Sequence, residues 1–506
     1  MKITSIYAIL KEMKELKYFR LAIVLLLVLW SASLFPGEQD CFTIIVGKKA
    51  SASGFVMVAH NEDDAGKNFF VNIHKISSTH HSSSQKVRLK NNAELAQVEQ
   101  TQGFLWFHIP GAEFGDSYIN QKGVVITSNA CRSREDQPEL TDGGIGFMLR
   151  RLVAERASSA REAVKIAGQL IEKYGYYSSG RCYAIADSKE GWLLQIVKGK
   201  HWIAQRVPDD QVAVMANCYT ITAVDLKNKK KFLGSNDIVD YAIKRGWYQR
   251  DRDGEFNFAR VYTAPGNIKS KVNALRQWRG INLLSKKKYK MGSQFPFSFT
   301  PRKGVKLNDL FKVLRDHYEA TKYDLTDDYK KGSPHSTKNR TICTETTRYS
   351  FVAILRDNLP VEIAHCIWIA FKRPDANAFS PWYVSISMPP EGYTRGSSDT
   401  ALQSHFNQPE DFFKFNADYA YWHFAKLSDL VDGNYKSHIK IVRKEWKNFE
   451  DYATKRLKKM EKEFVYLLEK NKNVAVKIIT NFIHKLEYRK WFLTLELINQ
   501  LGKKKN

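Results

Sequence analysis

The sequence predicts an α+β protein in which sheets are covered by helices. Short β-rich runs, a segment with helical periodicity and a second block of strands follow one another along the chain. Strands, then a helix, then strands again are typical of a layered fold. The composition is that of a globular protein, with 43% hydrophobic and 26% charged residues. At roughly 150 residues per domain, the 506 residues leave room for about three units.

The first predicted element is a hairpin. The runs FTIIV (42–46) and FVMVA (55–59) are rich in β-formers, and a loop with a glycine at each end joins them. A second hairpin-like stretch is GVVIT (123–127), which ends in SNA. Residues 147–173 then carry apolar side chains at the spacing of a helix.

Further strands are predicted in the middle of the chain, and helices at its end. The stretch 225–305 is basic and shows few periodic segments. From about residue 417 an apolar stripe with mixed charge elsewhere predicts helices that pack on the sheets. The predicted strands are 182–186, 192–197, 201–207 and 211–217, with another strand-rich block at 349–388.

The N-terminal segment has the features of an export signal. Basic residues in 1–20 precede the uncharged run LAIVLLLVLW (21–30) and the small residues SAS (31–33). Such an apolar run is shorter than the about 20 residues that span a bilayer. We therefore expect export, with a signal peptide cleaved near residue 33, while an uncleaved signal anchor stays open as the alternative.

Charge and cysteine content limit the function classes. The net charge is +26, from 79 Lys and Arg against 53 Asp and Glu, but the basic residues are scattered. No zinc-finger spacing or RNA-binding aromatic motif accompanies them, which favours a solvated surface over a nucleic-acid site. The six cysteines form no CxxC or Cys/His metal spacing, so we expect no metal and no cofactor.

Cys41 stands directly before the first predicted strand and just after the leader. A cut before Cys41 would give this residue both a thiol, with a pKa near 8.5, and an α-amine, with a pKa of about 7.7–8.0. The amine can then accept the thiol proton, which makes one residue both nucleophile and base. The residues HNED (60–63) follow the second strand, and we expect Asp63 to hydrogen-bond the α-ammonium.

The stretch CFTIIVGKKASASGFVMVAHNEDD (41–64) resembles the opening of the dipeptidase A and secernin family of N-terminal-nucleophile cysteine hydrolases. The resemblance extends from Cys41 to about residue 450. It implies a four-layer αββα fold and amide hydrolysis through an acyl-enzyme. Further matching segments, in the same order, are 118–130, 155–175, 183–217, 275–285, 340–371 and 420–435.

The resemblance also implies roles for individual residues. Cys41 matches the nucleophile, Asp63 the aspartate that supports the amine, and Asn129 and Asn217 the asparagines that bind the oxyanion. His60 stands where many relatives have an arginine, and histidine is cationic only below about pH 6.5 unless its pKa is perturbed. We therefore expect His60 to give weaker electrostatic support. Arg260, in FNFARVY, is a further match to a later arginine of the family.

The resulting hypothesis is an exported cysteine dipeptidase that matures by autoproteolysis between Asp40 and Cys41, with a separate protease as the second route. An amidase or acyltransferase on non-peptide amides, and a catalytically silent binding protein, are the alternatives. The expected partners are dipeptides and no nucleic acid, with a membrane only through an uncleaved leader; a homo-oligomer is left open. The expected domains are a leader at 1–33, a propeptide at 34–40, the αββα catalytic domain at 41–400 and a helical region at 401–506.

Overall fold

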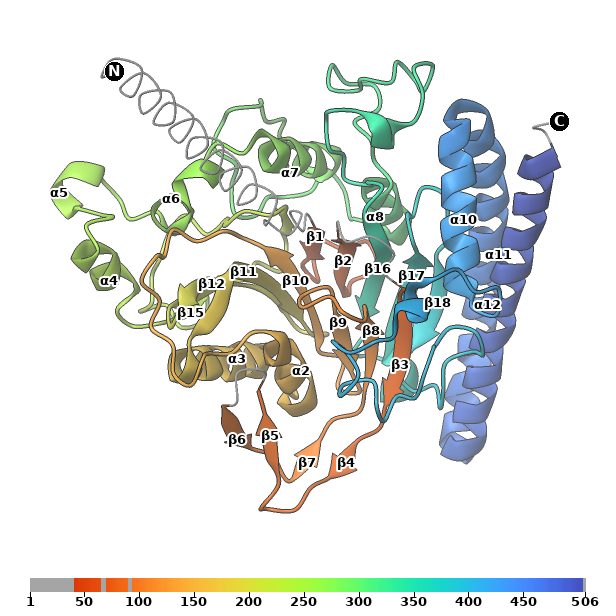
Figure 1. Ribbon diagram of the computed structural model, residues 1–506, viewed down its shortest axis with the longest axis horizontal. Helices are drawn as coiled ribbons and strands as arrows, with labels where there is room; N and C mark the ends of the chain where they lie inside the picture. Colours follow the sequence, from red (N-terminus) through yellow and green to blue (C-terminus); the bar gives the residue numbers. More distant parts are fainter. Residues whose placement is uncertain (1–40, 65–69, 90–92, 504–506) are drawn as a thin grey trace, which may run out of the picture. The chain divides into compact units, whose positions relative to one another are not determined.

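Two antiparallel sheets lie face to face in the computed structural model (Figure 1). The structure describes residues 41–64, 70–89 and 93–503, so the predicted leader and propeptide lie outside the described residues. The described residues all belong to one compact unit, residues 39–506. In this part of the chain, no helix combines the length and the apolar character that crossing a bilayer requires.

The smaller sheet has six strands, and Cys41 directly precedes its strand β1. Strand β1 pairs on one side with β14 and on the other with β2, which in turn pairs with β16. The sheet order is β14 (Val212–Met215), β1 (Phe42–Val46), β2 (Val56–Asp63), β16 (Thr347–Leu355), β17 (His365–Phe371) and β18 (Ser380–Tyr383).

The larger sheet has eight strands, and two short two-stranded ribbons extend from its β3 side. Its order is β15 (Phe232–Gly234), β13 (Trp202–Val207), β12 (Gly191–Gly199), β11 (Tyr176–Ala186), β10 (Val125–Ala130), β9 (Ser117–Asn120), β8 (Phe104–His108) and β3 (Asn72–Ile76). The ribbons are β4 (Thr79–His80) with β7 (Gln100–Thr101) and β5 (Lys86–Arg88) with β6 (Glu94–Ala96).

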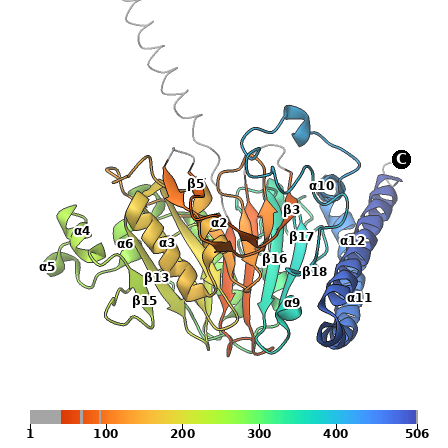
Figure 2. The same ribbon diagram turned by 90° about the horizontal axis from the view of Figure 1, so that it is seen from below.

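Helices α2 (Phe147–Arg156) and α3 (Ala160–Tyr174) cover the outer face of the larger sheet (Figure 2). Helix α3 begins where the Ser159 side chain accepts a hydrogen bond from the Glu162 backbone N–H. It ends at Gly175, whose φ of 76° suits glycine, and a Cβ there would clash with the Glu139 carbonyl oxygen. The predicted helical segment is therefore two helices.

The smaller sheet is covered by α7 (Lys271–Leu284) and α8 (Leu307–Leu314), which contact β14, β2 and β16. The long helices α11 (Tyr435–Lys470) and α12 (Lys472–Gly502) pack beside β18, and α10 (Ala420–Gly433) packs on both. The layer order is thus helix, sheet, sheet, helix, and the predicted α+β, αββα fold is confirmed. The remaining helices are α4 (Ile238–Lys244), α5 (Arg250–Asp253), α6 (Phe258–Tyr262) and α9 (Val361–Ala364), with 3₁₀ turns η1 (Pro265–Asn267), η2 (Pro334–Ser336) and η3 (Glu410–Phe413).

Candidate active site

The HNED segment is the end of a buried central strand. All eight residues of β2 are buried, because β1 and β16 flank it and helices or the second sheet cover its faces. His60, Glu62 and Asp63 are each 0% exposed. The segment therefore belongs to the strand instead of following it as predicted, and each polar group in it needs a buried partner.

The alternation of a β-strand separates these polar residues onto two faces. His60 and Glu62 share one face of β2, and His60 lies opposite Thr43 in the pairing with β1. That face looks toward the larger sheet, since the Thr43 hydroxyl donates to Asn129 Oδ1 on β10 at 2.6 Å. Asn61 lies on the opposite face, where its side chain donates to the carbonyl oxygen of Leu314 at the end of α8. The polar network around Cys41 therefore lies between the two sheets.

A chain of hydrogen bonds runs from the Cys41 thiol through this interface. The thiol donates to Glu62 Oε1 at 3.3 Å, and Glu62 Oε2 lies 2.9 Å from His60 Nε2. His60 Nδ1 lies 2.8 Å from the Thr43 hydroxyl, which itself donates to Asn129 Oδ1. Nδ1 must therefore carry a proton, because the only proton of the hydroxyl is committed to Asn129.

Burial sets the protonation states of the pair in this chain. It lowers the pKa of His60 to about 3, with the nearby Arg150 guanidinium acting in the same direction. Burial also raises the pKa of Glu62 well above its ordinary value of 4.5. Both shifts favour the neutral forms, an imidazole and a carboxylic acid, with the Glu62 proton directed at His60 Nε2.

The expected electrostatic role of His60 is corrected by this result. A neutral imidazole carries no positive charge at pH 7 and does not replace an arginine. What His60 offers is an acceptor for the proton of Glu62. The positive charge near the site comes from Arg150 and Arg181, which are buried and which act on Glu62 in the direction that lowers its pKa.

The Cys41 thiol is not pre-ionised in this arrangement. Burial raises its pKa well above the ordinary value of 9.0, and the neighbouring Glu62 and Asp63 carboxyl groups raise it further. A thiolate is the nucleophilic form of cysteine. Any reaction at this sulfur therefore requires a base that takes the proton during the reaction.

The backbone of Cys41 is held by an arginine from α7. Arg276 is 0% exposed, and its Nη1 donates to the Cys41 carbonyl oxygen at 3.3 Å. Its Nη2 donates to Asn217 Oδ1 at 3.0 Å and to Asn273 Oδ1 at 2.6 Å. Asn273 also donates to the Asn217 carbonyl oxygen at 2.8 Å. Arg276 therefore fixes the orientation of the Asn217 amide through its Oδ1.

Asp63 lies beside Cys41, but its side chain forms its hydrogen bond with another residue. Its main-chain carbonyl oxygen is 3.8 Å from the Cys41 sulfur. Its carboxylate accepts a hydrogen bond of 2.6 Å from the Thr347 hydroxyl, across the β2–β16 pairing. The aspartate is thereby fixed at the end of β2, next to the start of β1.

The structure brings together most of the residues that the sequence singled out. Cys41 and His60 are linked through Glu62, Asn129 joins them through Thr43, and Asn217 is joined through Arg276. Arg260 is different, because it is exposed on α6 and its side chain donates to the Asp253 carbonyl oxygen. Arg276 is the arginine that reaches Cys41.

Sequence reasoning missed Glu62 and Arg276. Glu62 could have been found, since strand alternation places it on the face of His60 rather than that of Asp63. Arg276 lies in LRQWRG, within a matching segment, but on a helix that the basic stretch 225–305 did not predict. All six cysteines lie in the described part of the chain, and each is a free thiol.

Two clusters in the described residues bring potential metal ligands within 4.8 Å of one another. One consists of Cys41, His60 and Glu62. The hydrogen bonds among these three account for their ligand atoms without an ion. The second cluster lies around His335 and is treated below.

The chain is similar to several known proteins. Residues 40–448 match the sequence model of a family described as Peptidase family C69. A probable dipeptidase from Latilactobacillus sakei is 25% identical over 411 residues, 78% of this chain and 81% of that protein. Dipeptidase A from Lactobacillus helveticus is 25% identical over 421 residues, 79% of this chain and 83% of that protein. The solved structure of penicillin V acylase from Agrobacterium tumefaciens aligns with a TM-score of 0.33 and 12% identity, over 68% of this chain and 85% of that one.

Proposed function

Because the chain belongs to peptidase family C69 and is therefore a hydrolase, we propose that it cleaves dipeptides with Cys41 as an N-terminal nucleophile. The observation that carries the proposal is that both the side chain and the backbone of Cys41 are held by hydrogen bonds at the start of β1. Its thiol is hydrogen-bonded to Glu62 and its carbonyl oxygen to Arg276. A residue whose side chain and backbone are both oriented by buried polar groups is prepared for one reaction geometry.

Maturation is the first reaction that this geometry supports. The thiol of Cys41 attacks the carbonyl carbon of Asp40, the S–C bond forms and the C–N bond between the two residues breaks. The thiol proton passes to Glu62 Oε1 while the Oε2 proton passes to His60 Nε2, so no bare charge is left on the carboxyl group. The released α-nitrogen takes this proton back from the His60–Glu62 pair, which returns to its starting state. Water then hydrolyses the thioester to give the free thiol and the Asp40 carboxylate, and a proton leaves to solvent.

Peptide hydrolysis follows with a new base. The α-amine of Cys41 accepts the thiol proton, and the sulfur attacks the peptide carbonyl carbon of the substrate. The C–N bond breaks, the leaving amine takes the proton, and water hydrolyses the acyl-enzyme. Asp63 is the proposed partner of the ammonium form. The proposed oxyanion donors are the amide groups of Asn217 and of Asn129, whose Nδ2 donates to the Met215 and Ala216 carbonyl oxygens in the structure. Such a donor contributes about 2.7–4 kcal/mol to transition-state stabilisation.

Dipeptides are the proposed substrates because the two relatives reported above are named as dipeptidases. A dipeptide has a free ammonium and a free carboxylate close to the scissile bond. A site that prefers dipeptides must compensate both charges, whereas an amidase for neutral acyl groups requires an apolar slot. Comparing dipeptides with N-acetylated and C-amidated versions of the same sequence separates these two substrate classes.

The decisive test of the proposal uses one variant and one matched control. Cys41→Ala is expected to fold and to lose dipeptide hydrolysis and labelling by an acyl electrophile. Cys366→Ala removes another buried free thiol, on β17, and is expected to keep both. Turnover that persists in Cys41→Ala, with wild-type contamination excluded, would contradict the proposed nucleophile. A wild-type protein that binds dipeptides without hydrolysing them would support the binding-protein alternative.

We also propose that the protein is exported through its N-terminal leader. The support is the order of basic, apolar and small residues in 1–33. The prediction is checked by fractionating cells that express the full chain and sequencing the exported form. Recovery of the uncut chain in the membrane fraction would instead favour a signal anchor.

A further inference from the structure

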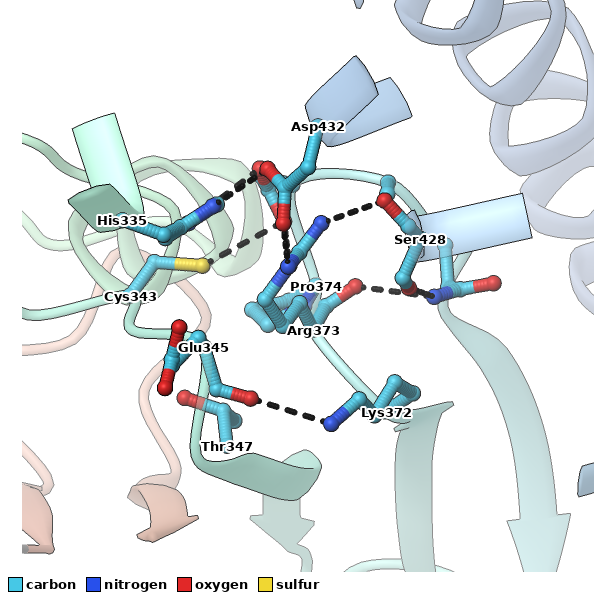
Figure 3. A network of polar contacts seen from close by, with 12 residues as sticks. His335, Cys343, Glu345, Thr347, Lys372, Arg373, Pro374, Ser428 and Asp432 are labelled. Carbon is cyan, nitrogen blue, oxygen red and sulfur yellow. Dashed lines mark hydrogen bonds and ion pairs between the residues drawn. The ribbon is translucent and has the colours of Figure 1, made fainter. Parts of the chain in front are cut away.

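Four potential metal ligands from separate segments meet in a buried cluster behind the candidate active site. They are His317 after α8, His335 in η2, Cys343 before β16 and Asp375 after β17, and their ligand atoms all lie within 4.8 Å of one another. Each of these four side chains is at most 1% exposed. Figure 3 shows Cys343 beside His335, with Asp432 and Arg373 facing them.

Both histidines turn their Nε2 atoms toward each other and their Nδ1 atoms toward carboxylates. His335 Nδ1 is 2.8 Å from Asp432 Oδ1, and His317 Nδ1 is 3.4 Å from Glu319 Oε1. A carboxylate partner fixes the proton on Nδ1 and leaves a lone pair on Nε2. The two Nε2 atoms are nevertheless only 3.2 Å apart. At this distance either one Nε2 carries a proton and donates it to the other, or both lone pairs face one cation.

The spacing of the cluster fits a tetrahedral ion. With Zn–N of about 2.0–2.1 Å and Zn–S of about 2.3 Å, ligand atoms are separated by about 3.3–3.6 Å. The two Nε2 atoms are 3.2 Å apart, and Asp375 Oδ2 lies 3.7 Å from His335 Nε2 and 3.8 Å from His317 Nε2. Cys343 Sγ is 3.4 Å from Asp375 Oδ1. These distances are close to the tetrahedral spacing, and all four ligand atoms lie within 4.8 Å of one another.

The charged groups in contact with the ligands are net acidic. Asp375, Asp432 and Glu319 are three carboxylates, and Arg373 and Arg443 are the guanidinium groups that pair with them. These five groups sum to one negative charge, which favours cation binding.

We propose that His317, His335, Cys343 and Asp375 form a structural metal site that binds one divalent ion, with Zn²⁺ as the best match. Nitrogen and thiolate ligands with one carboxylate select zinc over magnesium or calcium. With four protein ligands the site is closed, which is typical of structural rather than catalytic zinc. Asp432 and Glu319 are the outer carboxylates that orient the two imidazoles.

The site would connect the loops that support the catalytic residues. Cys343 lies four residues before Thr347, whose hydroxyl holds the Asp63 carboxylate. The backbone N–H of Cys343 donates to the carbonyl oxygen of Asp316, and the Asp316 carboxylate pairs with Arg279 on α7. Helix α7 is also the helix that reaches the catalytic cysteine. Metal binding at this cluster would thus stabilise both sides of the active site.

This proposal departs from the expectation of no metal, because the ligands are spread over residues 317–375 and form no compact motif. It also stands independently of the proposed peptidase mechanism. Its test therefore uses the Cys41→Ala protein, in which the other cluster, Cys41 with His60 and Glu62, lacks its sulfur ligand. We expect elemental analysis of this full-length protein to find about one zinc ion per chain.

Three variants in the Cys41→Ala background assign the ion to the cluster. Cys343→Ala is expected to lose the zinc, while Cys366→Ala, which removes a buried thiol elsewhere, keeps it. Asp432→Asn should lower the zinc affinity by about 10–100-fold, since it removes the partner that orients His335. Zinc retained at full occupancy in Cys343→Ala would overturn the assignment.

Cobalt substitution keeps the proposal testable if Cys343→Ala does not fold. Co²⁺ in the Cys41→Ala protein is expected to give the strong visible bands of a tetrahedral site and a thiolate-to-cobalt charge-transfer band. A chelator should lower the Tm of the zinc form, and added zinc should restore it. A folded protein that contains less than about 0.1 zinc per chain and takes up neither ion would overturn the proposal. The cluster would then be a hydrogen-bonded histidine pair.

Discussion

Replacing Glu62 by glutamine separates the protonation state of this residue from its shape. The glutamine side chain would keep both hydrogen bonds, because an amide oxygen accepts from the Cys41 thiol and an amide N–H donates to His60 Nε2. These are the bonds of the neutral form of Glu62, which has contacts of 3.3 Å and 2.9 Å to the same two atoms. The variant loses only the capacity to exchange a proton. We therefore expect Glu62→Gln to fold normally but to block maturation.

The effect on stability has a defined sign. The pKa of Glu62 is raised in the folded protein, so the folded chain keeps a proton that the unfolded chain releases above about pH 4.5. The contribution of Glu62 to stability is full below pH 4.5 and is lost as pH rises toward its folded pKa. Each pH unit costs about 1.36 kcal/mol. Between pH 4.5 and its folded pKa, the wild-type protein therefore loses stability that the glutamine variant does not lose.

Denaturant unfolding at pH 4 and pH 7 measures this difference. Glu62→Gln should match the wild-type free energy of unfolding at pH 4 and exceed it at pH 7. Glu450→Gln is the matched control, because Glu450 is ion-paired with Arg315 at 2.5 Å and its substitution should reduce stability. Intact mass over time follows maturation, which should slow by about a hundredfold or more. A Glu62→Gln protein that is less stable at pH 7, or that matures at the wild-type rate, would refute the neutral-pair reasoning.

Three further predictions concern residues around the nucleophile. Arg276→Lys should lower kcat/KM by about tenfold or more, because an ammonium group does not reproduce the forked contacts to the Cys41 carbonyl oxygen and Asn217. Unchanged kinetics would show that Arg276 does not belong to the site. Thr347→Val should lower the free energy of unfolding by about 1–3 kcal/mol, measured in urea, and should lower activity. Thr347→Ser keeps the hydroxyl and should preserve both stability and activity. Asn129→Ala and Asn217→Ala should each lower kcat by about a hundredfold with a smaller change in KM. A rise in KM alone would make the asparagine a substrate-binding residue.

The sequence predicted those parts of the fold and site that depend on local patterns. The β-rich runs beside Cys41 and the apolar spacing in 147–173 correspond to β1, β2, α2 and α3. The charge state of His60 could not be predicted, because its low pKa comes from burial in a central strand. One neighbour of that strand is β16, which lies almost 300 residues later in the sequence. Strands β3 to β8 and helix α7 were missed, since their sequences lack a clear period.

Long-range contacts explain the remaining gaps in the predicted site. Arg276 is 235 residues from Cys41 in sequence, and only the packing of α7 on β14 brings the two together. Arg260 was matched to the later arginine of the family by its flanking residues, yet α6 leaves it exposed. The ligands of the proposed metal site come from four loops or turns. Short sequence motifs report contacts within one element, and these residues meet only when both layers of helices are in place.

The most direct test of the proposed mechanism is the N-terminus of the active protein. The α-amine of Cys41 becomes a base only when the bond to Asp40 is broken, because an amide nitrogen does not accept a proton near neutral pH. Cut and uncut chains are separated, sequenced from the N-terminus and assayed on the same dipeptide. We expect all turnover in the form that begins Cys-Phe-Thr-Ile-Ile. Full activity in a chain that still begins at Leu34 or Met1 would contradict the terminal-amine mechanism and leave Glu62 and His60 as the base.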